Sequence, residues 1–238
     1  MKLPPLHDFD PALFAHGRAL WRGPGTDAAR FSPRMARSLV HRVCEASPGA
    51  TLWDPFCGTG LIPSVARLFY GRSLQAVWAS DLDAAVVQIA HKNLGLCHDP
   101  EIARLRLRAV RGLSGQNAKS ARRWGQVERY LHRLLPRIEQ AAKEPVDTQT
   151  WVGDAADLPD GDGPIYIVTD APYDRSSALR GPPLDAIVHA WLHDGRVRGI
   201  SMVTATLPTV DPADAQVERV AVRGDRWLWS ARRPHGAR

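Results

Sequence analysis

The sequence predicts an α/β protein with a doubly wound, mostly parallel sheet, a basic helical insertion and a C-terminal antiparallel hairpin. Short apolar strands alternate with amphipathic helices over residues 50–95, a pattern typical of parallel sheets with flanking helices. A glycine turn directly joins the first of these strands to its helix. Near the C-terminus, two alternating segments flank an Arg-Gly-Asp-Arg run at 223–226, which indicates a hairpin.

The composition favours one globular domain. The chain has 238 residues, of which 44% are hydrophobic and 24% charged, enough apolar content for a core. We expect a single domain over 1–238, with an N-terminal segment and helix within 1–47 and an inserted helical element over 99–147. No apolar run reaches the ~18 residues that cross a bilayer, and the N-terminus lacks the apolar stretch of a signal peptide. The predicted location is cytoplasmic, with no membrane partner.

The first half of the chain is expected to alternate helices and strands. A helix over 32–46 begins with a Ser-Pro pair, which suits a cap and a first helical position. A strand over 50–53 leads into a glycine turn at 54–60 and then a helix through about Phe69. A second strand over 74–80 is followed by another amphipathic helix. This series predicts neighbouring parallel strands.

The second half is expected to contain the insertion, further strands and the hairpin. Residues 99–147 show no strand pattern, but apolar residues from Tyr130 to Ile138 recur at helical spacing. The later elements are strands at 150–152, 165–169 and 199–206, a helix around 184–192, and a hairpin formed by 217–222 and 227–231.

Positive charge is concentrated in the insertion. The chain holds 31 Lys and Arg against 25 Asp and Glu, a net charge of +6, and residues 104–143 hold eleven basic residues against two acidic ones. Because Arg and Lys bind phosphates regardless of sequence, this segment is expected to grip a nucleic-acid backbone. A solvated helical face is the alternative. The expected contacts include Arg111, Lys119, Arg122, Arg123, Arg129 and Arg133.

The glycine turn and two acids indicate a nucleoside-bearing cofactor. Gly58 and Gly60 open a helix, where bare backbone can approach a ligand, although a tight turn without a ligand has the same pattern. Asp81 ends the second strand about 20 residues further on, where an acid can accept from both ribose hydroxyls. Asp54 ends the first strand and can pair with an ammonium group, but it is poorly placed for a pyrophosphate. These positions favour S-adenosylmethionine over a dinucleotide.

Two later strand ends complete the predicted site. Asp154 follows the third core strand, where it can accept from an adenine amino group or cap a helix. Residues 169–173 read Thr-Asp-Ala-Pro-Tyr directly after the fourth core strand, where open α/β sheets bind ligands. Asp170 can accept from the N–H groups of a flat base, Pro172 stiffens the backbone, and Tyr173 can stack on the base. Alone this is a turn, but after the other elements it is predicted to be catalytic.

The cysteines and histidines suggest neither disulfides nor a metal. Cys44, Cys57 and Cys97 form no C-x-x-C pair, which fits a reducing compartment. His189 and His193 have helical i,i+4 spacing but lack the intervening acid of a zinc-protease motif. No metal site is therefore predicted.

The ordered motifs resemble those of the class I, S-adenosylmethionine-dependent methyltransferases, which have a Rossmann-like sheet. The likeness is strongest to the group with Asp-Pro-x-Cys-Gly-x-Gly in the first motif and (Asp/Asn)-Pro-Pro-(Tyr/Phe) in the fourth, which methylates amino groups of bases. It spans residues 50–206. It implies S-adenosylmethionine bound by Asp54, Cys57, Gly58, Thr59, Gly60, Asp81, Leu82 and Asp154, and catalysis by Asp170, Pro172 and Tyr173.

A narrower resemblance is to the avilamycin-resistance family of 23S ribosomal RNA guanine methyltransferases. It rests on residues 51–55, 79–81 and 169–173, on the Arg-rich insertion, and on an upstream Phe-x-x-Arg that adds Arg34 to the expected RNA contacts. It implies methylation of a guanine in 23S RNA and resistance to a ribosome-targeting antibiotic. The chain has Ala171 where the larger group has Pro, and a ring-nitrogen target would use the pocket differently.

Two other function classes remain open on the sequence. One is a DNA or transfer-RNA amino-methyltransferase with the same fourth motif. The other is a non-catalytic nucleic-acid-binding domain that keeps the fold, which the complete set of acidic positions disfavours.

Overall fold

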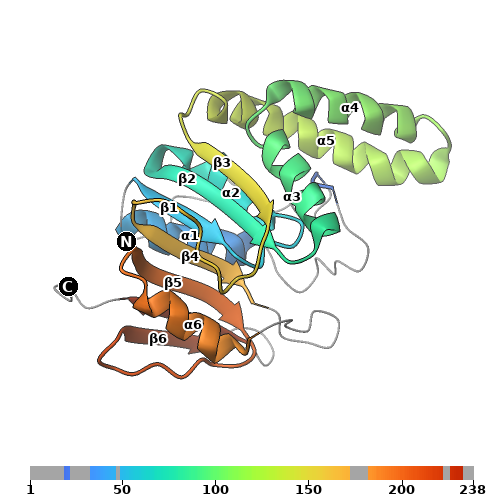
Figure 1. Cartoon of the computed structure of the whole chain (residues 1–238). Coiled ribbons are helices and arrows are strands. Elements are labelled where there is room, and N and C mark those ends of the chain that lie inside the picture. The colour runs from blue at the N-terminus through green and yellow to red at the C-terminus, as the bar shows by residue number, and fades with distance from the viewer. Residues whose placement is uncertain (1–18, 22–32, 47–48, 172–181, 222–225, 233–238) are drawn as a thin grey trace.

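A seven-stranded sheet runs through the centre of this computed structural model (Figure 1). The structure describes residues 19–21, 33–46, 49–171, 182–221 and 226–232. The strands are β1 (Ala50–Asp54), β2 (Leu74–Asp81), β3 (Asp147–Val152), β4 (Ile165–Asp170), β5 (Val197–Thr204), β6 (Gln216–Ala221) and β7 (Trp227–Arg232). The helices are α1 (Pro33–Ala46), α2 (Leu61–Tyr70), the 3-10 helix η4 (Gly71–Ser73), α3 (Ala84–Leu96), α4 (Pro100–Ser114), α5 (Ala118–Ala141) and α6 (Leu184–His193).

The strand order is β3-β2-β1-β4-β5-β7-β6. Strands β3, β2, β1, β4 and β5 pair in parallel. Strand β7 is antiparallel to both of its neighbours, β5 and β6. The predicted fold class is thereby confirmed, including the C-terminal antiparallel hairpin. The turn of that hairpin, at 222–225, lies outside the described residues.

Several strand boundaries differ from the sequence-based expectation, most of all in β3 and β5. Strand β3 begins at Asp147, three residues earlier than expected, because its first residues are polar and show no apolar alternation. They lie at the edge of the sheet, where only backbone pairing with β2 defines the strand. Strand β5 ends at Thr204 instead of residue 206. The Thr204 hydroxyl donates to the Thr206 carbonyl (2.7 Å) and closes a turn there.

Helices cover both faces of the sheet. Helices α1, α2 and α3 share one hydrophobic core with residues such as Leu52 and Val168, which point to that side. Helix α6 covers the other face together with Trp53 and Ile167, the neighbouring residues in the same strands. Adjacent strand residues therefore enter opposite cores, as the two-residue period of a strand requires.

Helices α4 and α5 form an antiparallel pair, here called the helical hairpin, that projects from the body (Figure 1). It occupies the position of the predicted insertion. The Arg67 guanidinium of α2 donates to the Ala141 carbonyl (2.8 Å) at its base, and the buried Glu144 carboxylate lies 3.6 Å from Arg67 and 3.3 Å from Arg72. Burial lowers the pKa of Arg67, and Glu144 opposes that shift. No helix in the described part of the chain is both long and apolar enough to cross a bilayer.

Candidate active site

Strand β1 ends between two neighbours that continue past it at the carboxyl-end edge of the sheet, and this place in the sheet is here called the crevice. Asp54, the last residue of β1, lies opposite Ala79 of β2, two residues before Asp81. On the other side, the pairing of β1 with β4 places Asp54 level with Val168, two residues before Asp170. After β1 the chain forms β2 and then β3 on one side of β1. It then crosses over and forms β4 and β5 on the other side of β1. Open α/β sheets bind ligands at this switch point, and a carboxylate stands on each side of it.

Asp54 forms the floor of the crevice and is almost fully buried. Its Oδ1 atom accepts a hydrogen bond from the Thr169 hydroxyl (2.7 Å) and a longer one from the Phe56 amide (3.4 Å). Burial raises the pKa of Asp54 to about 8, the two hydrogen bonds oppose that shift, and the nearby Asp170 and Asp81 carboxylates add to it. A buried carboxyl group with two further carboxylates beside it makes a site that favours a cationic ligand.

Asp170 ends β4 on the wall of the crevice. Burial raises the pKa of its carboxyl group to about 7, while Arg226 pulls that pKa down. Its Oδ1 atom is buried and has no hydrogen-bond partner among the described residues. A buried carboxylate oxygen without a partner is costly, and a ligand that donates a hydrogen bond would relieve that cost.

The glycine loop is shaped by both of its glycines. Gly58 and Gly60 have positive φ values of 50° and 81°. A Cβ atom on Gly60 would come within 3.0 Å of Ala90 in α3, whereas one on Gly58 would meet nothing within 4 Å. The Gly58 amide donates to Asp81 Oδ2 (3.0 Å), and the Asp83 amide donates to Asp81 Oδ1 (3.0 Å). The loop therefore packs against α3 at Gly60, holds the Asp81 carboxylate, and leaves space beside Gly58.

Cys57 lies within the same loop and is buried. Burial raises the pKa of its thiol well above the usual range, and the Asp54 and Asp81 carboxylates raise it further. The thiol therefore stays protonated and donates to the Gly58 carbonyl (3.6 Å). This environment disfavours an ionised thiol, and the predicted contact of Cys57 with the cofactor stays a prediction.

Sequence reasoning missed Asn93, a fully buried residue of α3. Its side-chain amide donates to the Thr59 carbonyl (2.7 Å) and the Trp21 carbonyl (3.0 Å), and its Oδ1 accepts from the Trp21 amide (2.7 Å). Trp21 in turn lies under the Arg106 guanidinium of the helical hairpin, 4.6 Å from its ring centroid. Asn93 thus joins the glycine loop to the N-terminal segment and, through it, to the hairpin. The only sign of this role in the sequence is that Asn93 lies beside the apolar face of α3.

Apolar side chains stand exposed beside Asp81. Leu82 is 44% exposed, and Val152, which pairs with Asp81 across β2 and β3, is 53% exposed. Exposed aliphatic groups next to the acid that is predicted to bind a ribose suit a purine ring. Asp154 follows on the same edge, where its Oδ1 accepts from the Ala156 amide (2.9 Å) in a turn. The helix-cap alternative for Asp154 is wrong, because a turn follows it and no helix.

The structure brings the predicted cofactor residues together at one edge of the sheet, together with Asp170. Pro172 and Tyr173 lie outside the described residues, as do the side chains of Arg34 and Arg123. The described members of the predicted RNA-binding set lie on the helical hairpin, away from the crevice, and all are exposed: Arg111, Lys119, Arg122, Arg129 and Arg133. Arg111 is engaged by Glu128, whose carboxylate accepts from its Nε atom (2.9 Å).

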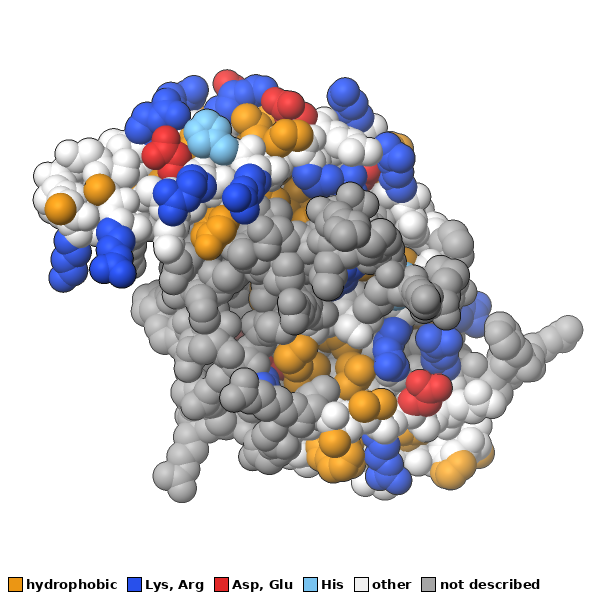
Figure 2. Space-filling model, turned by 180° about the vertical axis from the view of Figure 1, so that it is seen from behind, with side chains coloured by type: hydrophobic (Ala, Val, Ile, Leu, Met, Phe, Trp, Pro, Cys, Tyr) orange, Lys and Arg blue, Asp and Glu red, His pale blue; other side chains and the backbone are white. Residues whose placement is uncertain are grey.

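Basic side chains of α5 share one face of that helix, here called the basic stripe. Figure 2 shows Lys and Arg side chains on the projecting part of the molecule, with acidic side chains and a histidine among them. Lys119, Arg122, Arg129 and Arg133 recur at helical spacing and share that face. The buried side chains of the same helix include Val127, Leu131, Leu134 and Ile138, which lie toward the opposite face. These four members of the predicted basic segment are therefore presented to solvent on one side of a projecting element.

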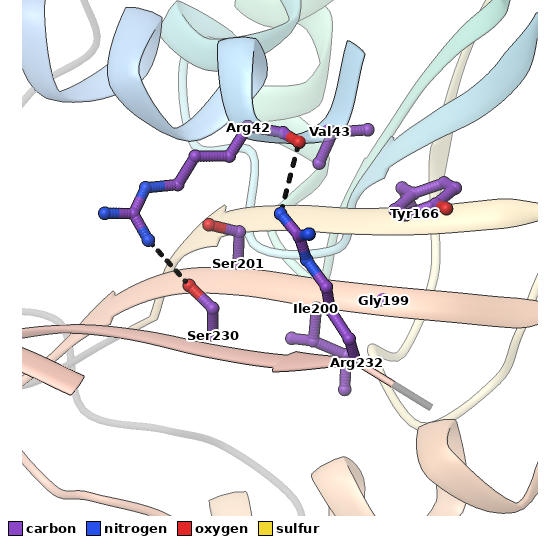
Figure 3. Close-up of a pocket in the computed structure, with 8 residues that line it drawn as sticks. All are labelled: Arg42, Val43, Tyr166, Gly199, Ile200, Ser201, Ser230 and Arg232. Carbon is purple, nitrogen blue, oxygen red and sulfur yellow. Dashed lines mark hydrogen bonds between the residues drawn. The ribbon is translucent and has the colours of Figure 1, made fainter. Parts of the chain in front are cut away.

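A separate small pocket lies between α1 and the sheet (Figure 3). Its lining residues are Arg42, Val43, Tyr166, Gly199, Ile200, Ser201, Ser230 and Arg232. Those of β5 come from the middle of that strand, whereas the crevice lies at the carboxyl ends of the parallel strands. Two long hydrogen bonds join its polar groups: Arg42 donates to the Ser230 hydroxyl (3.5 Å) and Arg232 to the Arg42 carbonyl (3.5 Å). The buried Ser201 hydroxyl has no hydrogen-bond partner among the described residues. This pocket is distinct from the cofactor site.

Comparison with known proteins identifies the family. Residues 7–193 match the family model of the rRNA methyltransferase AviRa. The chain is 31% identical over 191 residues to the 23S rRNA (guanine(2535)-N(1))-methyltransferase of Streptomyces viridochromogenes, covering 72% of this chain and 70% of that protein. Two structures of rRNA methyltransferase AviRa from the same organism each superpose with a TM-score of 0.72, at 26% and 25% identity, over 94% of this chain and 93% of theirs. The chain therefore belongs to the AviRa family of ribosomal RNA methyltransferases, enzymes that use S-adenosylmethionine as methyl donor.

Proposed function

We propose that this enzyme methylates the N1 atom of a guanine in 23S ribosomal RNA. The observation that carries the proposal is at the switch point, where the Oδ1 atom of the buried Asp170 carboxylate has no hydrogen-bond partner in the part of the chain that the structure describes. Guanine N1 carries a hydrogen that such an oxygen can accept. The 31% identity to a 23S guanine N1-methyltransferase supports the same base, atom and RNA.

The cofactor fits the described side of the crevice. S-adenosylmethionine supplies an electrophilic methyl group on a sulfonium centre when bound. Asp54 lies where its carboxylate can pair with the cofactor's ammonium group, and Asp81 is held by two loop amides at the place of the ribose. The exposed Leu82 and Val152 would contact the purine, and Asp154 its amino group. The open space beside Gly58 admits the cofactor next to the backbone.

Asp170 has two roles in the proposed reaction. It orients the guanine by accepting the N1 hydrogen bond, and it takes the N1 proton as the methyl group transfers to that nitrogen. A carboxyl pKa raised to about 7 suits a base that works near neutral pH. The base must be extruded from folded RNA, and stacking on Tyr173 would offset part of the unstacking cost, with Pro172 stiffening the loop. Most of the catalysis then comes from positioning.

The helical hairpin would hold the RNA backbone. Its basic stripe contacts phosphates without reading sequence, so the choice of target comes from RNA shape and from the crevice. Methylation of one ribosomal guanine would give resistance to an antibiotic that binds beside it. Such a substrate also places the enzyme in the cytoplasm.

Side-by-side transfer of a labelled methyl group tests the substrate. We expect incorporation into 23S RNA and not into 16S RNA, transfer RNA or duplex DNA, with the label recovered as N1-methylguanine after digestion. Label in the guanine exocyclic amino group would replace the ring-nitrogen assignment with the amino-methyltransferase class. Label in transfer RNA or DNA alone would reject the ribosomal substrate.

Removing two charges from the stripe should weaken RNA binding and its salt dependence. The change Arg122→Ala with Arg129→Ala is expected to lower the slope of log affinity against log salt by about 1–2, because each phosphate contact releases counterions. The matched control is Arg198→Ala with Arg219→Ala, two exposed arginines on β5 and β6 at the other end of the sheet. Equal slopes for the parent and the stripe variant would leave the hairpin as a solvated surface.

A further inference from the structure

We infer that this protein carries a surface site for a divalent transition metal, formed by His189, His193 and Asp214. Among the described residues, these are the one group of three His, Cys, Asp or Glu side chains whose ligand atoms all lie within 4.8 Å of one another. The two histidines are one turn apart on α6, and Asp214 lies in the connection between β5 and β6. Spacing within one helix could not reveal this third ligand.

The histidine pair is arranged for chelation. The rings stack with centroids 4.0 Å apart and planes inclined by 28°. The His193 Nδ1 atom lies 2.9 Å from the His189 carbonyl oxygen, which can only accept, so Nδ1 carries the hydrogen and Nε2 has the lone pair. Metal-binding histidines usually donate their second ring nitrogen to a carbonyl or carboxylate in this way. The hydrogen bond therefore fixes the tautomer that a metal requires.

Asp214 is held near the histidines by contacts that do not involve a metal. Its backbone amide donates to the Asp211 carbonyl (2.9 Å), and Ala215 beside it is buried in the core under α6. Earlier in the same connection, the Thr209 amide donates to Asp185 Oδ1 at the start of α6 (2.8 Å). The connection is thus fixed to α6, and the carboxylate is positioned by the fold.

The ligand set selects the class of metal. Two imidazoles and one carboxylate suit Zn²⁺, Co²⁺, Ni²⁺ or Cu²⁺, whereas Mg²⁺ and Ca²⁺ prefer all-oxygen sites. Tetrahedral Zn²⁺ with bonds of about 2.0–2.1 Å keeps its ligand atoms about 3.3 Å apart. Since the ligand atoms all lie within 4.8 Å of one another, reaching that separation takes at most about 1.5 Å of movement by side chains that are exposed or half-buried. The remaining positions would be filled by water.

The location makes the site structural. His193 ends α6 just before β5 begins, and Asp214 lies two residues before Gln216, which pairs through β7 with the start of β5. The crevice lies at the opposite ends of the parallel strands. Strand β6 is an edge strand and is exposed along its whole length. A metal at this site would therefore fix the segment that leads into β6 to helix α6, without contacting the reacting groups.

Metal titration of the full chain, without a polyhistidine tag, tests the site. We expect one Zn²⁺ per chain by calorimetry, a visible absorption band on adding Co²⁺, and no competition from Mg²⁺. His193→Ala and Asp214→Asn should each weaken Zn²⁺ binding by at least about 10-fold. Zn²⁺ at 100 times its Kd should raise the melting temperature of the parent by about 5–10 °C. Methyl transfer should be unchanged.

The control variant is His132→Ala, which removes an exposed histidine from α5 and should bind Zn²⁺ like the parent. Circular dichroism of each metal-free variant checks that it is folded. Unchanged affinity in Asp214→Asn would reduce the site to a histidine pair and overturn the proposal. Equal losses in His132→Ala and His193→Ala would show nonspecific binding and overturn it as well.

Discussion

Asp170→Asn should lower the single-turnover methylation rate, at saturating RNA and cofactor, by about 100-fold or more while leaving cofactor binding intact. The asparagine keeps a side-chain oxygen but cannot take a proton, and a positioned base contributes about 10²- to 10⁴-fold. The parent rate should rise with pH up to about 7, because only the ionised carboxylate accepts the proton, and then level off. The variant should lack that rise.

The matched control for this change is Asp157→Asn, an exposed carboxylate in the connection between β3 and β4. It should keep the parent rate and the parent pH profile. A parent-like rate in Asp170→Asn would make the loop after β4 structural, and the proposed chemistry would fail with it. A large loss that keeps the parent's pH profile would leave Asp170 as an orienting group only.

Asp54→Asn should stabilise the cofactor-free protein at pH 8 and weaken cofactor binding. Burial holds a proton on Asp54 up to a pKa of about 8, against 3.8 for an ordinary aspartate. Between these values the folded state binds more protons than the unfolded state, so raising the pH favours unfolding. For this group alone the free energy of unfolding falls by about 1.4 kcal/mol for each pH unit. Asparagine keeps an oxygen for Thr169 and Phe56 and removes this dependence.

Denaturant unfolding between pH 5 and pH 8 measures this difference in slope between parent and variant. Calorimetry at pH 8 should show about 10-fold or greater loss of S-adenosylmethionine affinity, since a charged partner for the ammonium is gone. Asp157→Asn serves again as the control, with neither effect expected. Parallel pH slopes for the parent and Asp54→Asn would mean that the crevice does not hold a proton on Asp54.

The predictable parts of this molecule are those with local signatures. The glycine turn at Gly58 and Gly60 and the acids at strand ends follow from strand-turn-helix patterns, and the sheet places them together. The polar start of β3 gave no such pattern, because an edge strand is defined by pairing with its neighbour and not by apolar alternation.

Contacts between distant segments were beyond sequence reasoning. Asn93 is polar beside an apolar helical face, but its partners Trp21 and Thr59 are 72 and 34 residues away. Asp54 is buried between two flanking strands that continue past it, and only the register of strand pairing shows this. The roles of Pro172 and Tyr173 in the loop after β4 stay predictions, because both residues lie outside the described residues.

The helical hairpin sets a minimum size for an efficient substrate. The stripe from Lys119 to Arg133 extends about 21 Å, at 1.5 Å per residue, on an element separate from the crevice. A nucleoside or a short oligonucleotide can occupy the crevice without reaching that stripe. Such a substrate therefore makes no contact between its phosphates and the stripe. The smallest RNA that reacts efficiently is then defined by the span from a sheet edge to a projecting helix, and not by the dimensions of one base.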